Sequence, residues 1–281
     1  MEKFERSWRI MRASWDLLRQ DKEILLFPVL SGAALILILA SFAVPVMALG
    51  GVETVQRVAR HNGTVGNLVV FFAFYFINYF VILFFNTAVV ACATIRMRGG
   101  NPTVGDGLHT AFARLFEIAG WALVSASVGM LLRMIEERSR LVGRIVAGLL
   151  GMAWGITSYL VVPILVNERK GPMEAFRESA RLLKKTWGEE LIGGFSFSLL
   201  FFVLSLPAVA LIAAGAASGK GFVAIGFIAL AGAYVVTLSA VQAALQGIFQ
   251  AALYQYAKKG ETPRGFEREV LNEAITPRSF G

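Results

Sequence analysis

The chain has 281 residues, of which 56% are hydrophobic and only 16% are charged, and its mean hydropathy is +0.63. Soluble domains carry about 25% charged residues, so this composition excludes a soluble globular protein and indicates a membrane protein. The net charge is +8. Because the Lys and Arg residues lie beside apolar stretches rather than on one compact face, we expect anionic lipid headgroups as their partner and no binding to nucleic acid.

The residue pattern of 1–23 predicts an amphipathic helix that lies in the membrane interface. Charges alternate with large apolar residues from the start, which is not the pattern of a signal peptide. The apolar side chains recur at helical spacing at Phe4, Trp8, Met11, Trp15 and Leu18. Tryptophan beside basic residues is typical of the headgroup region. The side chains expected to contact lipid headgroups or a partner protein here are Arg6, Trp8, Arg9, Arg12 and Trp15.

Six apolar stretches follow within a membrane domain of residues 24–257, each expected to cross the bilayer as a helix. They are predicted at 24–49, 68–95, 118–132, 145–166, 191–214 and 222–257. The sequence leaves open whether 133–144, which is rich in Arg and Glu, forms a protruding helix or a loop. Cys92, the single cysteine, is expected to be a small core residue. The polar tail, 258–281, is predicted to be a mobile terminus with a short helix near 266–274.

Two further amphipathic helices are predicted between the spans, at 103–117 and 172–188. Thr103 can cap the first, and Pro172 suits the first turn of the second. On the second helix, one apolar stripe comprises Met173, Phe176, Ala180, Leu183 and Trp187. We expect Glu178 and Ser179 on the solvated surface of this helix. The residues expected to contact lipid headgroups or a partner protein are Arg177, Arg181, Lys184, Lys185 and Trp187.

Together these elements predict an all-α fold, a polytopic membrane helical bundle of about six transmembrane helices and three amphipathic interfacial helices. If the chain crosses the bilayer six times, one side carries 20 Lys and Arg residues and the other side carries 7. Loops rich in Lys and Arg stay in the cytoplasm. We therefore expect both termini and all three interfacial helices on the cytoplasmic side.

Two segments carry a resemblance to a known family. The first comprises Pro163 to Val166, Gly171-Pro172, Ala175, Ser179-Ala180 and Lys185 to Gly193, and the second comprises Phe4 to Trp15 and Asp21 to Ser31. In these residues the chain resembles an uncharacterised bacterial family of six-span integral membrane proteins. The resemblance implies the fold and a place in the bacterial cytoplasmic (inner) membrane, but no activity. A looser similarity extends to membrane domains attached to some phosphodiesterases, although the chain carries no catalytic domain.

Polar residues within two spans form a candidate polar path or packing face. They are Gln242, Gln246 and Gln250 in the sixth span and Tyr75, Tyr79 and Asn86 in the second. Under one interpretation they form hydrogen bonds between helices, each contributing about 0.6 kcal/mol. Under the other they line a hydrated path for a small solute. The hydrogen-bonding interpretation is favoured. Ion-coupled carriers commonly place a charged residue within a span, and neither of these two spans contains one.

These observations favour a non-enzymatic scaffold or accessory protein that binds anionic lipid or partner proteins. A transporter or channel for a small uncharged solute or a lipid is the alternative. We expect no enzyme, metal or cofactor, because no nucleophile pairs with a base and the two histidines, His61 and His109, fall on opposite sides of the membrane. The small residues Gly143, Ala147 and Gly151 could bury a helix crossing within the monomer or in a homo-oligomer.

Overall fold

The computed structural model describes residues 2–48, 63–138, 142–187 and 197–272, and within these ranges it contains helices and no strands. The predicted all-α fold is therefore confirmed. The elements are α1 (Glu2–Gln20), the 3-10 helix η1 (Lys22–Leu25), α2 (Leu26–Ala48), α4 (Gly63–Met97), α5 (Val104–Ala113), α6 (Leu115–Arg138), α7 (Val142–Thr157), α8 (Val161–Glu168), α9 (Pro172–Trp187), α10 (Phe197–Ala217), α11 (Gly221–Lys259) and α12 (Arg268–Asn272).

Five helical stretches of the described residues are long and apolar enough to cross a membrane. They are Lys22–Val44, Leu68–Met97, Leu115–Glu137, Val142–Glu168 and Gly221–Lys259. A shorter apolar helical stretch, Phe201–Ala217, occupies most of the fifth expected span. The first residues of that span, 191–196, lie outside the described residues. The charged stretch after residue 132 is helical to Arg138, so α6 extends well beyond the span expected there.

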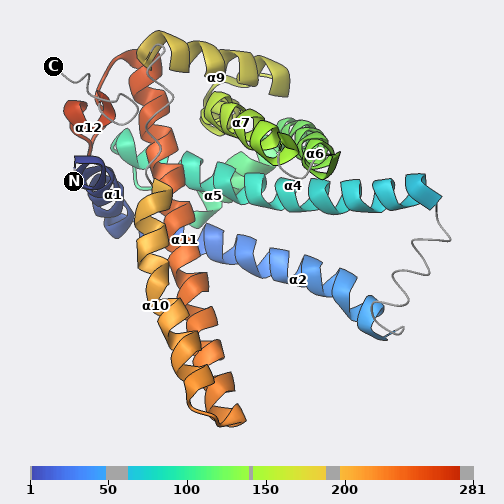
Figure 1. Ribbon diagram of the computed structural model, residues 1–281. Coiled ribbons are helices and arrows are strands. Elements are labelled where there is room, and N and C mark those ends of the chain that lie inside the picture. The colour runs from blue at the N-terminus through green and yellow to red at the C-terminus, as the bar shows by residue number, and fades with distance from the viewer. Residues whose placement is uncertain (1, 49–62, 139–141, 188–196, 273–281) are drawn as a thin grey trace.

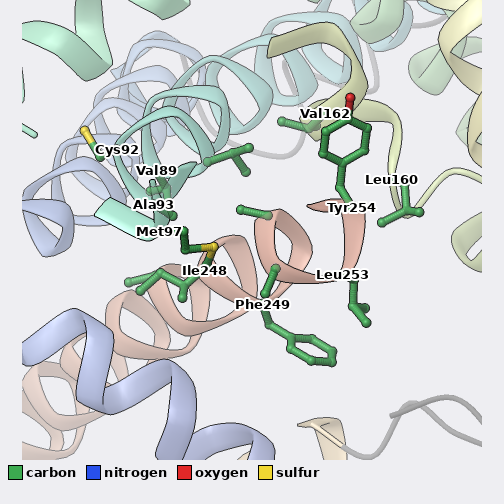
Figure 2. Close-up of a cluster of buried hydrophobic side chains, with 14 of the residues drawn as sticks. Val89, Cys92, Ala93, Met97, Leu160, Val162, Ile248, Phe249, Leu253 and Tyr254 are labelled. Atoms are coloured by element: carbon green, nitrogen blue, oxygen red, sulfur yellow. The ribbon is translucent and has the colours of Figure 1, made fainter. Parts of the chain in front are cut away.

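The buried core lies at one end of the spans, and we call this core the hub. Its largest fully buried side chains include Ile24, Phe27, Leu160, Ile164, Leu165, Leu183, Leu245, Ile248, Phe249 and Leu253. Figure 2 shows how residues of α4, α8 and α11 meet there, with Met97 near Ile248 and with Leu160 and Val162 near Tyr254.

α11 lies in the middle of the hub, where it contacts α1, α2, α4, α8, α9, α10 and α12. α10 and α11 form a hairpin that points away from the hub in one direction, while the outer ends of α2 and α4 point in another (Figure 1). Those outer parts expose apolar side chains such as Leu37, at 70%, and Phe222, at 88%. Such a surface is typical of a protein whose outer spans are solvated by lipid.

The fourth expected span, 145–166, is not one continuous helix. α7 ends at Thr157 and α8 begins at Val161. Pro163 has no N–H to donate and its ring crowds the carbonyl of the residue four positions earlier, Tyr159, which favours a break in the turn before it. The Ser158 hydroxyl donates to the Trp154 carbonyl at 2.6 Å, which stabilises the end of α7.

The small residues of α7 pack against α6 within the monomer. Gly143 and Ala147 are buried, and a Cβ added at Gly143 would lie 2.5 Å from the Ile135 carbonyl oxygen of α6. Gly151 also faces α6, with a Leu132 methyl carbon 3.6 Å from the position of an added Cβ. Of the two interpretations of this stripe, the structure therefore supports the helix crossing inside one chain.

The short helix predicted near 266–274 is present as α12, but up to residue 272 the tail packs against the hub instead of extending as a mobile terminus. Phe266 and Leu271 are buried, and α12 contacts both α1 and α11. These two apolar side chains anchor a segment that is polar on average, and a prediction from average polarity overlooks them. The remaining tail, 273–281, lies outside the described residues.

Candidate functional site

A cluster of charged side chains joins α8, α9 and α11 at the edge of the hub. The carboxylates are Glu168 and Glu178, whose side chains are 12% and 8% exposed. Lys258 Nζ lies 2.9 Å from Glu168 Oε1 and 3.1 Å from Glu178 Oε1. Lys170 Nζ lies 2.6 Å from Glu168 Oε2 and 3.6 Å from Glu178 Oε2. Arg181 completes the cluster, with Nη2 2.6 Å from Glu178 Oε2.

Hydrogen bonds lower the pKa of Glu178. Burial raises the pKa of Glu178, but hydrogen bonds from Arg181 and Lys258 outweigh burial and lower the pKa from 4.5 to about 2. The neighbouring Glu168 also accepts a hydrogen bond of 2.8 Å from the hydroxyl of Tyr254. Three cations thus surround two carboxylates, and the cluster locks the end of α11 to α8 and α9.

The low pKa of Glu178 predicts that acid weakens the hub. A carboxylate whose pKa is lowered by folding stabilises the folded state above its unfolded pKa, and this contribution disappears as the pH falls from about 4.5 toward 2. We expect the loss to be on the order of 1–2 kcal/mol, because the partner cations are partly exposed. Thermal unfolding in detergent micelles between pH 6 and pH 3 measures it, with Glu178→Gln as the comparison. A wild-type protein that loses no more stability in acid than this variant would contradict the assignment.

Ser179 lies beside this cluster and is fully buried, although we expected it on the surface of its helix. Its hydroxyl accepts a hydrogen bond of 3.1 Å from the Leu160 N–H and donates one of 2.7 Å to the Thr157 carbonyl. Both backbone groups belong to the break between α7 and α8. Ser179 therefore satisfies the groups that the broken helix leaves open. The predicted surface position of Ser179 is wrong because its hydroxyl bonds to backbone groups between α7 and α8 rather than to side chains.

The expected apolar stripe of α9 is displaced by one position along the helix surface. Ala175, Ser179, Leu182 and Leu183 are buried, whereas Met173 is 48% exposed. The smaller residues allow α9 to lie close to α8, and Phe176 stacks on Trp154 with ring centroids 5.0 Å apart. The expected position of Glu178 on a solvated face is also wrong, because this residue turns toward Lys258.

The basic residues of α9 stay on its outer face. Arg177, Arg181, Lys184 and Lys185 are all exposed. Of these, only Arg181 takes part in the charged cluster. The side chain of Trp187, predicted to contact the same partner, lies outside the description.

On α1, Trp8 is 47% and Trp15 41% exposed, and Arg9 and Arg12 are exposed as well. The side chain of Arg6 is not among those described. The face of α1 that enters the hub is Ile10, Ser14, Leu17 and Leu18, so the residues predicted to contact lipid headgroups or a partner lie outside it. The two tryptophans thereby remain accessible beside the hub.

The predicted polar faces of the second and sixth spans meet at one point. The Asn86 side-chain amide donates to Gln250 Oε1 at 3.2 Å, which links α4 to α11. Gly247 is buried between them, with Val89 Cγ1 2.5 Å from the position of an added Cβ. Gln242 and Gln246 are half-buried on α11. Close packing with a direct hydrogen bond supports a packing face at Asn86 and Gln250.

Tyr75 and Tyr79 belong to a different place. Their rings stack with centroids 6.5 Å apart, and the Tyr75 hydroxyl accepts a hydrogen bond of 3.1 Å from Arg133 Nη1 of α6. A Cβ added at Gly129 of α6 would lie 3.2 Å from the Tyr79 hydroxyl. The six residues therefore do not form one continuous face, and the tyrosines face α6 instead of α11.

Sequence reasoning also missed an ion pair between the beginning of η1 and the end of α4. Asp21, which is buried, accepts hydrogen bonds from Nε and Nη2 of Arg96, and Arg96 also donates to Asn101 at 2.6 Å. The following loop leads to α5, where Thr103 and Asp106 form the predicted cap. Within the described ranges, no three His, Cys, Asp or Glu side chains lie close enough together to hold a metal ion.

Comparison with known proteins identifies a family for this chain but no activity. A model of a family described as "Family of unknown function (DUF6159)" matches residues 65–265. These residues include the charged cluster, Ser179 and both polar faces. No curated protein matches the chain. No solved structure matches it either.

Proposed function

Because the chain belongs to this family of unknown function (DUF6159), its role has to be inferred from its own residues, and we propose that it is a non-enzymatic scaffold or accessory protein of the bacterial cytoplasmic membrane. It would bind anionic lipid headgroups through the outer face of α9 and the exposed part of α1. Both termini and the hub would lie on the cytoplasmic side, where Lys and Arg residues are concentrated.

The observation that carries this proposal is the two-sided construction of α9. Its inner face is fixed to the hub by Ser179 and Glu178. Its outer face presents Arg177, Lys184 and Lys185, which form no ion pair within the described part of the chain. A rigidly held row of cations beside a membrane attracts anionic lipid, at about 1 kcal/mol for each residue.

Two observations support this role over transport. Asn86 bonds directly to Gln250, and Gly247 allows α4 and α11 to approach closely at that level. The tyrosines of the second span face another helix. Both observations support a packing role for these polar residues over a hydrated path.

Charge reversal on α9 tests the proposal. We expect the Tm of the wild-type protein in nanodiscs to rise as phosphatidylglycerol replaces a zwitterionic lipid. The triple variant Arg177→Glu, Lys184→Glu, Lys185→Glu should lose at least half of that rise, because it replaces attraction by repulsion. Added salt should reduce the wild-type response as well, since exposed charges are screened.

The control is a second triple variant, Lys22→Glu, Lys259→Glu, Arg268→Glu, which changes the net charge equally at exposed positions outside α9. It should keep most of the response to phosphatidylglycerol. Equal responses of the two triple variants would mean that the total charge matters and the surface of α9 does not, and the proposal would then fail.

A further inference from the structure

A cleft of about 790 Å³ opens between α4, α6 and α7 at the ends of α6 and α7 that lie away from the hub. Its walls include Tyr75 of α4, Arg133, Glu136 and Glu137 of α6, and Arg144 of α7. Small-molecule sites commonly have volumes of about 300–1,000 Å³. This cleft is separate from the basic surface of α9, and none of its residues takes part in the charged cluster of the hub.

The charged groups of the cleft are balanced, with two arginines and two glutamates. Arg133 is already engaged, because its Nε donates to Glu137 Oε1 at 2.9 Å and its Nη1 donates to Tyr75. Arg144 and Glu136 form no ion pair within the described part of the chain. Arg144 and Glu136 are therefore open to a ligand. The ion pair between Arg133 and Glu137 holds the wall beside them in place.

A glycine allows close approach of the two helices that carry the open groups. A Cβ at Gly143 would lie 2.5 Å from the Ile135 carbonyl oxygen and 3.1 Å from that of Glu136. Only a residue without a side chain permits this approach of α7 to α6. As a result, Arg144 follows directly after the contact on one helix, and Glu136 stands at the contact on the other.

A smaller cavity of about 130 Å³ continues the cleft toward apolar surroundings. The two share Tyr75, Arg133 and Glu137. The other walls of the smaller cavity are apolar side chains, namely Leu68, Phe71, Met130 and Met134. A ligand with a charged head and an apolar chain fits this arrangement better than a wholly polar one does.

We propose that the cleft binds a phospholipid with a zwitterionic phosphoethanolamine headgroup. The guanidinium of Arg144 contacts the phosphodiester, since guanidinium and phosphate oxygens form strong charge-assisted hydrogen bonds. The carboxylate of Glu136 accepts hydrogen bonds from the ammonium group. The acyl chains leave past the smaller cavity, along the apolar side chains of Leu68, Phe71, Met130 and Met134. Because the formal charges of the walls cancel, a neutral zwitterion suits them better than an anionic lipid.

The test measures dissociation constants by native mass spectrometry of the full chain in a neutral detergent. The ligands are phosphatidylethanolamine, phosphatidylglycerol with the same acyl chains, and water-soluble phosphoethanolamine. Arg144→Gln and Glu136→Gln should each weaken phosphatidylethanolamine binding about fivefold, the effect of losing about 1 kcal/mol from an exposed ion pair. Glu136→Gln should leave phosphatidylglycerol binding unchanged, because this lipid has no ammonium group.

Lys220→Gln is the matched control, since Lys220 is an exposed cation in the turn between α10 and α11. It should leave phosphatidylethanolamine binding unchanged. The α9 triple variant should do so as well, which separates this site from the proposed function. Unchanged phosphatidylethanolamine binding in either Arg144→Gln or Glu136→Gln would overturn the headgroup assignment. Phosphoethanolamine that binds as tightly as the lipid would show that the ligand is a soluble molecule.

Discussion

Replacing Ser179 by alanine is expected to destabilise the protein by about 3 kcal/mol, because a single hydroxyl serves two buried backbone groups. The Leu160 N–H and the Thr157 carbonyl both lose a partner in this variant. Leu160 is fully buried, so water cannot easily replace the hydroxyl. The free energy of unfolding in a titration of mixed micelles with a denaturing detergent measures the loss.

Ser127→Ala provides the comparison for this variant. The Ser127 hydroxyl is exposed and bonds only to the Leu123 carbonyl, one turn earlier in its own helix. Its loss should change the unfolding free energy by less than about 0.5 kcal/mol. If both variants lose the same small amount, the break between α7 and α8 does not depend on Ser179.

Gly247→Ala should be nearly as damaging, at about 2–3 kcal/mol, because it overfills the crossing of α4 and α11. The added Cβ would lie 2.5 Å from Val89 Cγ1 and 3.0 Å from Asn86 Oδ1. The helices would have to separate, and the hydrogen bond between Asn86 and Gln250 would weaken. The same unfolding titration applies.

Gly232→Ala on the same helix should change the free energy of unfolding in the opposite direction. Nothing lies within 4 Å of a Cβ added at Gly232. Alanine is favoured over glycine in helices by roughly 0.5–1 kcal/mol, so this variant should be as stable as the wild-type protein or slightly more stable. A loss of stability in Gly232→Ala equal to that in Gly247→Ala would show that the close contact with α4 is not the cause.

Local patterns in the sequence predicted the helices well. The long apolar runs predicted where α2, α4, α6 and α11 lie, because a helix in lipid must satisfy its own backbone and needs few distant partners. The cap at Thr103 was predicted for the same reason, since it acts within one turn. Asn86 and Gln250 were both singled out from their polar faces, and they are in direct contact.

Long-range pairings could not be predicted in this way. Nothing near Glu178 in the sequence indicates Lys258, which lies eighty residues away. Helical spacing also allows more than one inner face on α9, and choosing the larger apolar residues selected Met173 instead of Ser179. The useful signal was the run of small residues at Ala175 and Ser179, which is typical of closely packed membrane helices.

The central position of α11 constrains the order of events during synthesis. This helix is synthesised after α1, α2, α4, α8, α9 and α10, yet all of them rest against it. The earlier spans can enter the bilayer while the chain grows, but their inner ends lack the partner that they share until residue 259 has been made. A ribosome that stalls before α11 would therefore leave inserted but unassembled helices, in which Asn86 lacks Gln250 and Glu168 lacks Lys258, exposed to membrane quality control.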